Sequence, residues 1–433
     1  MWIAKIKKIL ITIVCLSLAA LLIYFSDPDK TITLTLGVYS GSTWDVPSSG
    51  QFKNIDQFIK RYEKKYPHVK IKYTPGILKS DYSSWLSDQI INGKQPDVFM
   101  ILNDDFNLLA TNHALLNLNS YVFSNEINAN DFYSACLDAG LVNDRQYALP
   151  FESNPMMMCA NLDLLKKEHI SLPKSGWSFE EFYNICKKLT KDKNHDGVID
   201  QFGTCGVTWQ MVIEAFGISL FDADGTKANF NSEKVRNALT MYEKLISLNE
   251  QYSVKSSDFD KGKVAFMPMT LAEYRTYKPY PYKVARYSTF KWMTLPMPGA
   301  KTYNFPMETS LMGISSRTAH KEEAWNLLKM ATLDPTYQQR TFDASSAASP
   351  LKSVMLSKQT KAVLESDDMG KQVLTIQRLN QMMIHADTYP KFKKYNKAMD
   401  LADYLINQSI VNGSIETSLV NIQKRVQDLL NEK

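Results

Sequence analysis

The sequence predicts an α/β protein made of two lobes. Apolar strand-like runs alternate with amphipathic, helix-like segments over residues 32–102, and similar segments recur after residue 160. Between them, Pro150 and Pro155 bracket a polar elbow that precedes the apolar run Met156 to Ala160. Proline fixes φ and has no N–H, so this stretch cannot be a plain helix. We therefore interpret residues 147–161 as a crossing of the chain between the two lobes.

The first unit has the order strand, helix, strand, helix, strand. Residues 32–38 and 69–73 alternate and are rich in β-branched residues, whereas 97–102 is a continuous apolar run, as in a buried parallel strand. Apolar residues at helical spacing predict the helices between them, over 52–66 and 82–91. Ligands in such sheets lie beyond the carboxyl ends of the strands. This rule indicates the loops 40–45 and 103–105.

The remaining segments complete two α/β units. A capping box of Ser178 and Glu181 marks one helix start, Trp209 opens another helix, and residues 270–275 continue a strand into a loop. Later crossings are expected near 292–296 and 315–320. The other predicted helices are 106–118, 131–141, 162–167, 232–248, 320–333, 357–364, 394–410 and 415–430, and the other strands are 263–269, 292–296 and the run ending at 315.

Composition indicates an ordinary globular chain. Of 433 residues, 44% are apolar and 22% charged, and the net charge is +5 without a long basic block. This argues against a nucleic-acid partner. The length suggests two or three domains, and we expect a monomer. The 22 tyrosines and 7 tryptophans mildly favour a surface that recognises ring-shaped ligands.

The N-terminus resembles an export signal. Lys5, Lys7 and Lys8 precede a stretch without charges from Ile9 to Phe25. The bulky residues that end this stretch offer no small-residue cleavage site, so we predict an uncleaved membrane anchor with its basic end inside. Attachment of a lipid at Cys15 and secretion after cleavage are the alternatives. Each places residues 31–433 outside the cell.

Four cysteines follow this segment, at positions 136, 159, 186 and 205. None lies in a CxxC pair or beside a histidine at ligand spacing, which argues against zinc. A chain of this size does not need disulfides, and each cysteine has apolar neighbours. We expect buried free thiols.

Residues 192–200 have the spacing of a calcium loop. Oxygen-bearing side chains alternate, Gly197 stands at the sharp turn, and a carbonyl and further oxygens follow. The twelfth position is Gly203, where an EF-hand has a bidentate glutamate. The alternative is a metal-free turn rich in Asn, Asp and Gly. The candidate ligands are Asp192, Asn194, Asp196, Val198, Asp200 and Gln201.

The motifs of the common enzyme classes are absent. The sequence contains no GxSxG, HExxH or GxxxxGK[ST] motif, and its six histidines are scattered. By contrast, the predicted loops combine aromatic rings, which stack on sugars, with carboxylates and amides that bind hydroxyls. The candidate ligand-binding residues are Ser42, Trp44, Asp104, Glu152, Asn154, Trp209, Glu273, Tyr274, Glu308 and Tyr389, and Arg275 is a candidate for a basic cleft.

The order of several motifs resembles the extracellular sugar-binding proteins of ABC importers, the family of maltose- and alginate-binding proteins. The motifs are Pro96-Asp-Val-Phe, Tyr147-Ala-Leu-Pro with Asn161-Leu-Asp-Leu-Leu, Trp177-Ser-Phe-Glu-Glu-Phe, Asp196-Gly-Val-Ile-Asp-Gln-Phe-Gly, Gly262-Lys-Val-Ala-Phe-Met and Ala324-Trp-Asn-Leu-Leu-Lys. Two departures are Ala160, where the family usually has Tyr, and the missing lipobox.

The resemblance implies a type II periplasmic-binding-protein-like fold, with a ligand cleft between two lobes joined by several crossings. It implies residues 1–30 as anchor and tether, 31–148 with 293–318 as the N-terminal lobe, and 149–292 with 319–433 as the C-terminal lobe. It also implies a carbohydrate ligand, an ABC permease as partner, and sugar contacts at Asp104 and Asn154. No cofactor is expected to be required, and a structural Ca²⁺ and the metal-free turn stay open for residues 192–200. A surface adhesin or sugar sensor on the same fold and a glycosidase are the alternatives.

Overall fold

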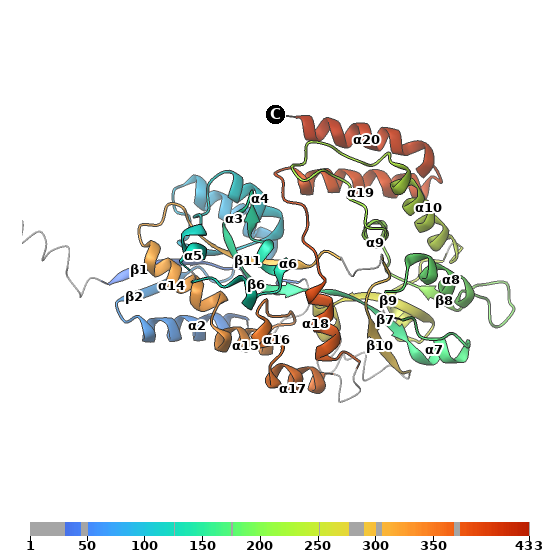
Figure 1. Cartoon of the computed structure of the whole chain (residues 1–433), viewed down its shortest axis with the longest axis horizontal. Helices are drawn as coiled ribbons and strands as arrows, with labels where there is room; N and C mark the ends of the chain where they lie inside the picture. The colour runs from blue at the N-terminus through green and yellow to red at the C-terminus, as the bar shows by residue number, and fades with distance from the viewer. Residues whose placement is uncertain are drawn as a thin grey trace, which may run out of the picture.

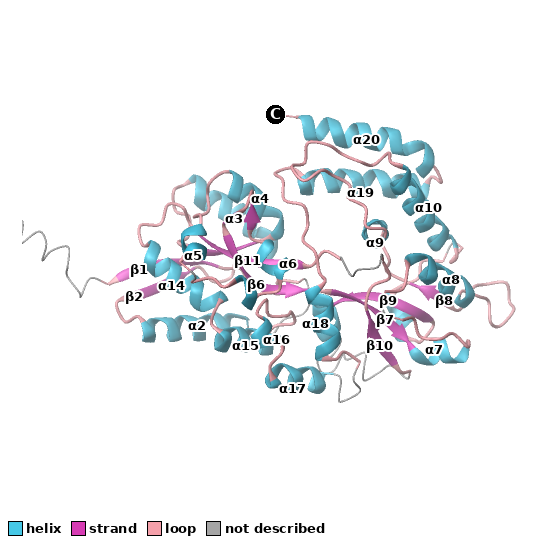
Figure 2. Cartoon of the chain, viewed as in Figure 1, coloured by secondary structure: helices cyan, strands magenta, loops and turns pink. Residues whose placement is uncertain are grey.

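The structure is a computed structural model. It describes residues 31–44, 51–124, 126–174, 176–250, 252–276, 290–299, 305–367 and 373–432. Two lobes lie side by side, each with its own sheet (Figures 1 and 2). The expected anchor at Ile9 to Phe25 lies outside the described residues, and among those described no helix is long and apolar enough to cross a bilayer.

The first lobe is built on a five-stranded mixed sheet. Strands β1, β2 and β3 run parallel, and β11 pairs antiparallel with both β3 and β6. The short run of β3 is buried on both faces, as the continuous apolar pattern predicts. In sheet order the strands are β2 (Val69–Tyr73), β1 (Ile32–Gly37), β3 (Val98–Ile101), β11 (Glu308–Ile314) and β6 (Ala148–Asn154).

Helices cover both faces of this sheet (Figure 1). The early helices are α2 (Gln51–Lys65), α3 (Lys79–Ile91), α4 (Asn103–Thr111), α5 (Asn119–Phe123), η1 (Ala129–Asp131) and α6 (Ser134–Asp138), followed by the hairpin β4 (Leu141–Val142) and β5 (Arg145–Gln146). The later helices are α14 (Lys321–Thr332), α15 (Pro335–Ala344), α16 (Lys352–Met355), α17 (Lys358–Asp367) and α18 (Ile376–Ile384).

The second lobe is built on a four-stranded sheet. Its strand order is β10 (Trp292–Leu295), β7 (Met156–Asn161), β9 (Val264–Thr270) and β8 (Phe202–Thr204). Its helices are α7 (Leu162–Lys167), α8 (Phe179–Leu189), α9 (Trp209–Ala215), α10 (Glu233–Ser247), α11 (Ser256–Asp260), α12 (Leu271–Thr276), α19 (Tyr395–Val411) and α20 (Ile415–Asn431). The capping box that begins α8 is present.

The first crossing lies where the prolines predict it. β6 belongs to the first sheet and β7 to the second, and Pro155 stands between them. On β7, Met157 and Cys159 join the larger core cluster, whereas Met158 and Ala160 join the smaller one. Successive side chains of a strand point to opposite faces, so the larger core continues across the crossing onto one face of the second sheet.

The structure differs from the expected lobe boundaries at two points. β10 pairs with β7, so the boundary expected at residue 293 falls inside the second sheet. After β11 the chain does not cross at 315–320, because α14 packs on β11 and β6, and α15 packs on α2. The later crossing instead runs between α18 and α19, since α20, which pairs with α19, packs on α10.

Two helices replace segments expected to be irregular. Residues 270–275 were expected to be a loop, but α12 begins at Leu271. Pro335, which follows the expected helix 320–333, starts α15, with the Asp334 carboxylate accepting bonds from the N–H groups of Thr336 and Tyr337. The expected helices 106–118 and 131–141 shorten to α4 and α6.

The four cysteines after the N-terminal segment are free and buried, as expected. Burial raises the pKa of Cys136 and of Cys205 to about 12, and raises the pKa of Cys159 and Cys186 well above the ordinary value. The Sγ atom of Cys136 lies 3.0 Å from Ser153 Oγ on β6.

Candidate functional site

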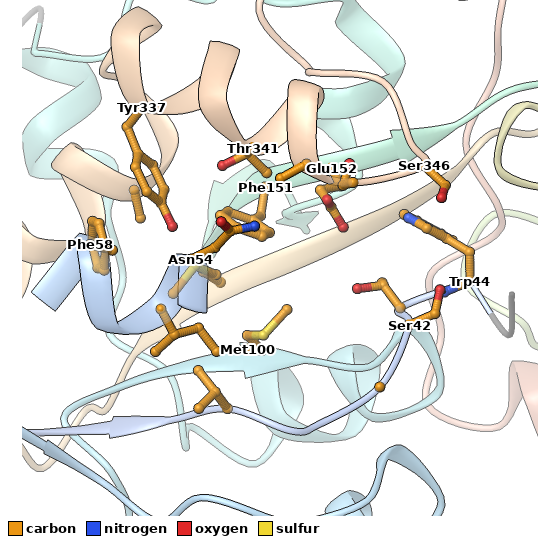
Figure 3. A pocket seen from close by; sticks show the side chains of 18 of the residues that line it. Ser42, Trp44, Asn54, Phe58, Met100, Phe151, Glu152, Tyr337, Thr341 and Ser346 are labelled. Atoms are coloured by element: carbon orange, nitrogen blue, oxygen red, sulfur yellow. The ribbon is translucent and has the colours of Figure 1, made fainter. Parts of the chain in front are cut away.

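A cavity opens on one face of the first sheet, and we call it the first-lobe cavity (Figure 3). It encloses about 210 Å³. Its walls come from the end of β1 and the following loop, α2, β6 and α15, and α12 of the second lobe contributes Arg275 and Thr276. Both lobes therefore meet at its rim.

The inner part of the first-lobe cavity is apolar and aromatic. The ring of Tyr337 packs on Phe58, with centroids 4.5 Å apart, and lies 6.5 Å from the ring of Phe151. Toward the mouth, Ser42 Oγ accepts a hydrogen bond from the N–H of Trp44 at 3.1 Å, which fixes the turn after β1. An aromatic wall beside hydroxyl groups is the surface that a sugar ring requires.

Glu152 is the buried acid of this cavity. It is 5% exposed and lies on β6. Burial raises the pKa of its carboxyl group, while the side chains of Ser345, Thr43 and Trp44 and the charge of Arg275 act in the opposite direction. The buried Nε1 of Trp44 has no hydrogen-bond partner of good geometry among the described residues. The cavity thus offers an acceptor and a donor close together.

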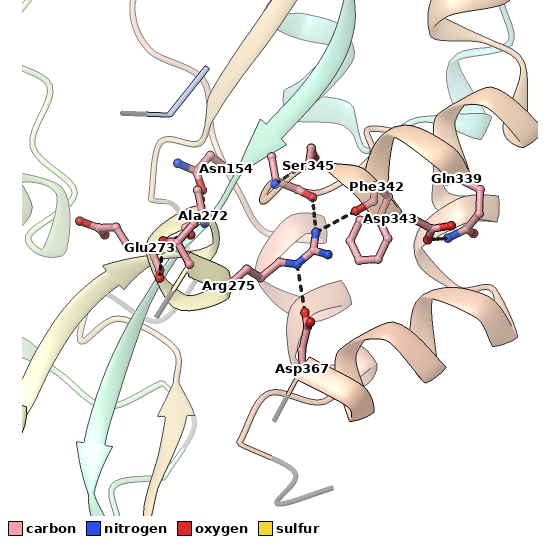
Figure 4. Close-up of polar contacts among 11 residues, drawn as sticks. Asn154, Ala272, Glu273, Arg275, Gln339, Phe342, Asp343, Ser345 and Asp367 are labelled. Carbon is pink, nitrogen blue, oxygen red and sulfur yellow. Dashed lines mark hydrogen bonds and ion pairs between the residues drawn. The ribbon is translucent and has the colours of Figure 1, made fainter. Parts of the chain in front are cut away.

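Arg275 joins the two lobes instead of forming a basic cleft (Figure 4). It stands on α12 and is 9% exposed. Its Nε donates to the Asp367 carboxylate of α17 at 3.0 Å, and its Nη1 donates to the carbonyls of Phe342 and Ala347 at 3.0 and 3.2 Å. The guanidinium also lies 4.3 Å from the centre of the Phe342 ring. Its Nε and Nη1 donors are therefore committed to protein partners.

A second pair of hollows, of about 280 and 530 Å³, flanks the segment from Thr388 to Lys391, and we call the pair the acidic groove. The first lobe contributes α4, α6, β4 and β11, and the second lobe contributes α9 and α19. Leu311 lines the groove and Met312 lines the first-lobe cavity. Because neighbours on a strand point oppositely, the groove and the cavity lie on opposite faces of the first sheet.

The predicted ligand-binding residues divide between these two places. Ser42, Trp44 and Glu152 line the first-lobe cavity. Asp104, Glu308 and Tyr389 line the acidic groove. We expected these six residues to belong to one ligand site, but the first sheet separates the two sets.

Four further candidates line neither hollow. Asn154 is 4% exposed, and its Oδ1 accepts from the N–H of Ala272 at 2.9 Å, so it ties the crossing to α12. Trp209 is 1% exposed, packs in the second core, and donates to Asp403 at 2.8 Å. Glu273 caps the start of α12 through Thr270, and Tyr274 is buried against Trp292. For Trp209 and Tyr274 the structure therefore shows core packing and not a binding surface.

The candidate calcium loop is an exposed turn held by its own backbone. The Asp192 carboxylate accepts from the N–H groups of His195 and Gly197, and Asp200 accepts from Lys193 N–H. Those N–H bonds lower the pKa of Asp192, the bond from Gly197 most. Across the described residues, no group of three or more His, Cys, Asp or Glu side chains is already placed to hold a metal ion.

One candidate ligand turns away from this loop. Gln201 is 2% exposed, and its Nε2 donates to the carbonyl of Leu189 at 2.8 Å. The remaining oxygens, from Asp192, Asn194, Asp196 and Asp200 with the carbonyl of Val198, are of the kind that calcium prefers.

The sequence missed several lining residues. In the first-lobe cavity these are Asn54 on α2 and Tyr337 and Thr341 on α15, and in the acidic groove they are Glu214, Lys391 and Tyr395. The N-cap and N1 proline at Asp334 and Pro335 would have identified α15 and with it the helix face that carries Tyr337.

The comparisons with known proteins agree with this architecture. The ABC substrate-binding protein Lmo0181 from Listeria monocytogenes in complex with cycloalternan is similar, with a TM-score of 0.69, 19% identity, and coverage of 93% of this chain and 100% of that one. The sugar-binding protein MalE from Xanthomonas citri gives a TM-score of 0.74 at 16% identity, covering 92% and 97%. The cyclic alpha-maltosyl-1,6-maltose binding protein from Arthrobacter globiformis gives 0.73 at 15% identity, covering 92% and 99%.

A curated relative and a family model extend the comparison. An uncharacterized lipoprotein in the oleD 5' region of Streptomyces antibioticus is 23% identical over 349 residues, covering 72% of this chain and 71% of that protein. The model of the bacterial extracellular solute-binding proteins matches residues 47–338. With both lobes, the crossings between them and this match in place, the chain belongs to the family of bacterial extracellular solute-binding proteins.

Proposed function

We propose that the protein is the substrate-binding subunit of an ABC importer, which captures a carbohydrate outside the cell and delivers it to a membrane permease. The observation that carries this proposal is that residues of both lobes line hollows that combine aromatic rings with oxygen donors and acceptors. Sugars require both kinds of surface, because one face of a ring is apolar and its hydroxyls are polar.

The ligands named for similar structures support an oligosaccharide. They include cycloalternan, cyclic alpha-maltosyl-1,6-maltose, mannotriose and maltose. A monosaccharide, tagatose, and a sugar alcohol, ribitol, are named for others.

Ligand binding would change the relative orientation of the two lobes. A ligand that contacts both lobes favours the arrangement in which both sets of contacts form, so it shifts the population toward a closed state. The crossings at Pro155, between β10 and β11, and between α18 and α19 are the segments that would bend. The protein would act by binding alone and not as an enzyme.

The proposed location is the outer face of the cell membrane. The basic, apolar N-terminus supports an anchor there, and the lipoprotein named among the relatives supports lipid attachment as the alternative mode. We further propose that residues 1–30 are anchor and tether and that the two sheets define the two lobes. The protein would work as a monomer.

Calcium would have a structural part in this proposal. Asp192, Asn194, Asp196 and Asp200 would hold the ion, with the carbonyl of Val198, and Gln201 would not. Bound there, the ion would tie down the exposed turn that follows α8. No step of sugar binding depends on it, and no other cofactor is proposed.

Isothermal titration with a panel of mono-, di- and oligosaccharides tests the proposal. We expect saturable binding of at least one oligosaccharide and no change in its length on prolonged incubation. Trp44→Phe should weaken that binding, whereas Trp85→Phe, on α3 and outside both hollows, should leave it unchanged. Absence of binding across the whole panel, or release of shorter sugars, would overturn the proposal.

A further inference from the structure

The acidic groove carries a charge opposite to that of the chain. Seven acidic residues line it, and Lys391 is the one basic residue among its described lining residues, so the formal balance there is seven negative against one positive. The whole chain has a net charge of +5. The acids are Asp104, Asp138, Asp144, Glu214, Asp222, Glu308 and Asp387.

Glu214 is a partly buried acid of the groove. It stands on α9 between the buried residues Ile213 and Ala215 and is half-buried itself. Burial, and to a smaller extent the charge of Asp387, raises the pKa of its carboxyl group to about 7. In the described part of the structure no ion pair reaches Glu214. It is a carboxyl group without a protein cation.

Lys391 cannot neutralise the groove. Burial lowers the pKa of its ammonium group to about 8, although the charges of Asp138 and Asp387 act in the opposite direction. One positive charge is thus shared by two acids from different elements, α6 and the crossing before α19. The neighbouring Lys394 is engaged elsewhere, since its Nζ donates to the carbonyls of Leu429 and Leu430.

An unpartnered acceptor lies in the same groove. Asn107 on α4 is 8% exposed and lines the hollow beside Asp104. Its Nδ2 donates to the carbonyl of Phe392 at 3.4 Å, but its Oδ1 has no hydrogen-bond partner among the described residues. A buried acceptor without a donor costs free energy, so this atom favours a ligand that donates.

Tyrosine rings supply the stacking surface. Tyr389, which is 38% exposed, lies 6.4 Å from Tyr395 between ring centres, and both line the groove. A ring-shaped ligand could therefore lie on an aromatic face while acceptors surround its edge.

We propose that the acidic groove recognises the amino-sugar unit of a glycan through a protonated amine, and that it rejects uronic acids. This inference rests on the proposed function and names the chemistry of the ligand at one part of the site. An ammonium group has three donors and no acceptor, which matches a groove of carboxylates and an unpartnered amide oxygen. A uronate would bring a further negative charge among seven acids.

The test compares three trimers of the same linkage by isothermal titration with the whole chain. They are a glucosamine trimer, the same trimer N-acetylated, and a glucuronate trimer, at a pH where the free amine is protonated. We expect the amine to bind at least about tenfold more tightly than the acetylated sugar, and the uronate to bind more weakly than either. High salt screens charges, so it should reduce the difference in affinity between the free amine and the acetylated sugar.

Glu214→Gln and Asp387→Asn should each reduce the preference for the amine. Glu322→Gln, an exposed acid on α14 outside the groove, is the matched control and should leave it unchanged. Equal or tighter binding of the acetylated sugar would overturn this inference and leave carbohydrate binding intact. If none of the three trimers binds, the inference is overturned, and the wider sugar panel then decides the proposed function separately.

Discussion

Replacing Arg275 with methionine should destabilise the contact between the lobes. Methionine keeps an unbranched apolar stem but removes the ion pair with Asp367 and the bonds to the carbonyls of Phe342 and Ala347. Breaking a buried ion pair by removing one partner costs about 3–5 kcal/mol. Since the Asp367 side chain is 21% exposed and can regain water, we expect a loss of about 3 kcal/mol, near the lower end of that range.

Urea unfolding measures this loss. The two lobes could unfold separately, so tryptophan fluorescence and far-ultraviolet circular dichroism should be followed together. Arg275→Lys keeps the charge but not the planar fork, and should lose part of the same stability. Arg340→Met, an exposed arginine on α15, is the control and should change stability by less than about 0.5 kcal/mol. A loss below about 1 kcal/mol for Arg275→Met would refute the clamp between the lobes.

Three other results follow from the structure. Trp209→Phe should lower the free energy of unfolding by about 1–3 kcal/mol, because the hydrogen bond to Asp403 is lost. It should leave sugar affinity unchanged, and weaker binding in a titration would show that Trp209 belongs to the sugar site. For Glu214 the folded pKa of about 7 lies above the ordinary 4.5, so the unfolded chain loses this proton first and stability falls as pH rises from 4.5 to 7. In urea unfolding at several pH values, Glu214→Gln should remove up to about 3 kcal/mol of this loss of stability between pH 4.5 and 7. The same dependence of stability on pH in the variant and the native protein would contradict this reasoning. Calcium at about 100 times its dissociation constant should stabilise the protein by about 2.7 kcal/mol. Asp196→Asn should abolish that gain, and a melting temperature insensitive to chelator would support the metal-free turn.

Periodicity and proline placement predicted the regular elements well. The alternation at 32–37 and 69–73 and the continuous run at 98–101 are properties of the strands themselves, so the sequence displays them directly. The crossing at Pro155 could be predicted as well, because the effect of proline on the backbone is local. The later crossings have no such local sequence signal. The crossing expected at 315–320 lies instead in the segment before α19.

The site was harder to predict because it depends on partners distant in sequence. Trp209 at a helix start has the same local signature whether it faces a ligand or a core, and its partner Asp403 lies 194 residues away. Arg275 had the charge of a basic-cleft residue, but Asp367 and two carbonyls hold it. Carboxylates that gather from α6, α9 and the last crossing share a groove only once both lobes have folded.

The buried thiols make the protein convenient for labelling studies of its own motion. Cys136, Cys159, Cys186 and Cys205 are free and enclosed, and their raised pKa values keep them as thiols at neutral pH. Folding of the described region therefore needs no oxidising partner. A cysteine placed on the surface of each lobe would react with a fluorophore far faster than these four, so the distance between the lobes could be followed during ligand addition without first removing these four residues.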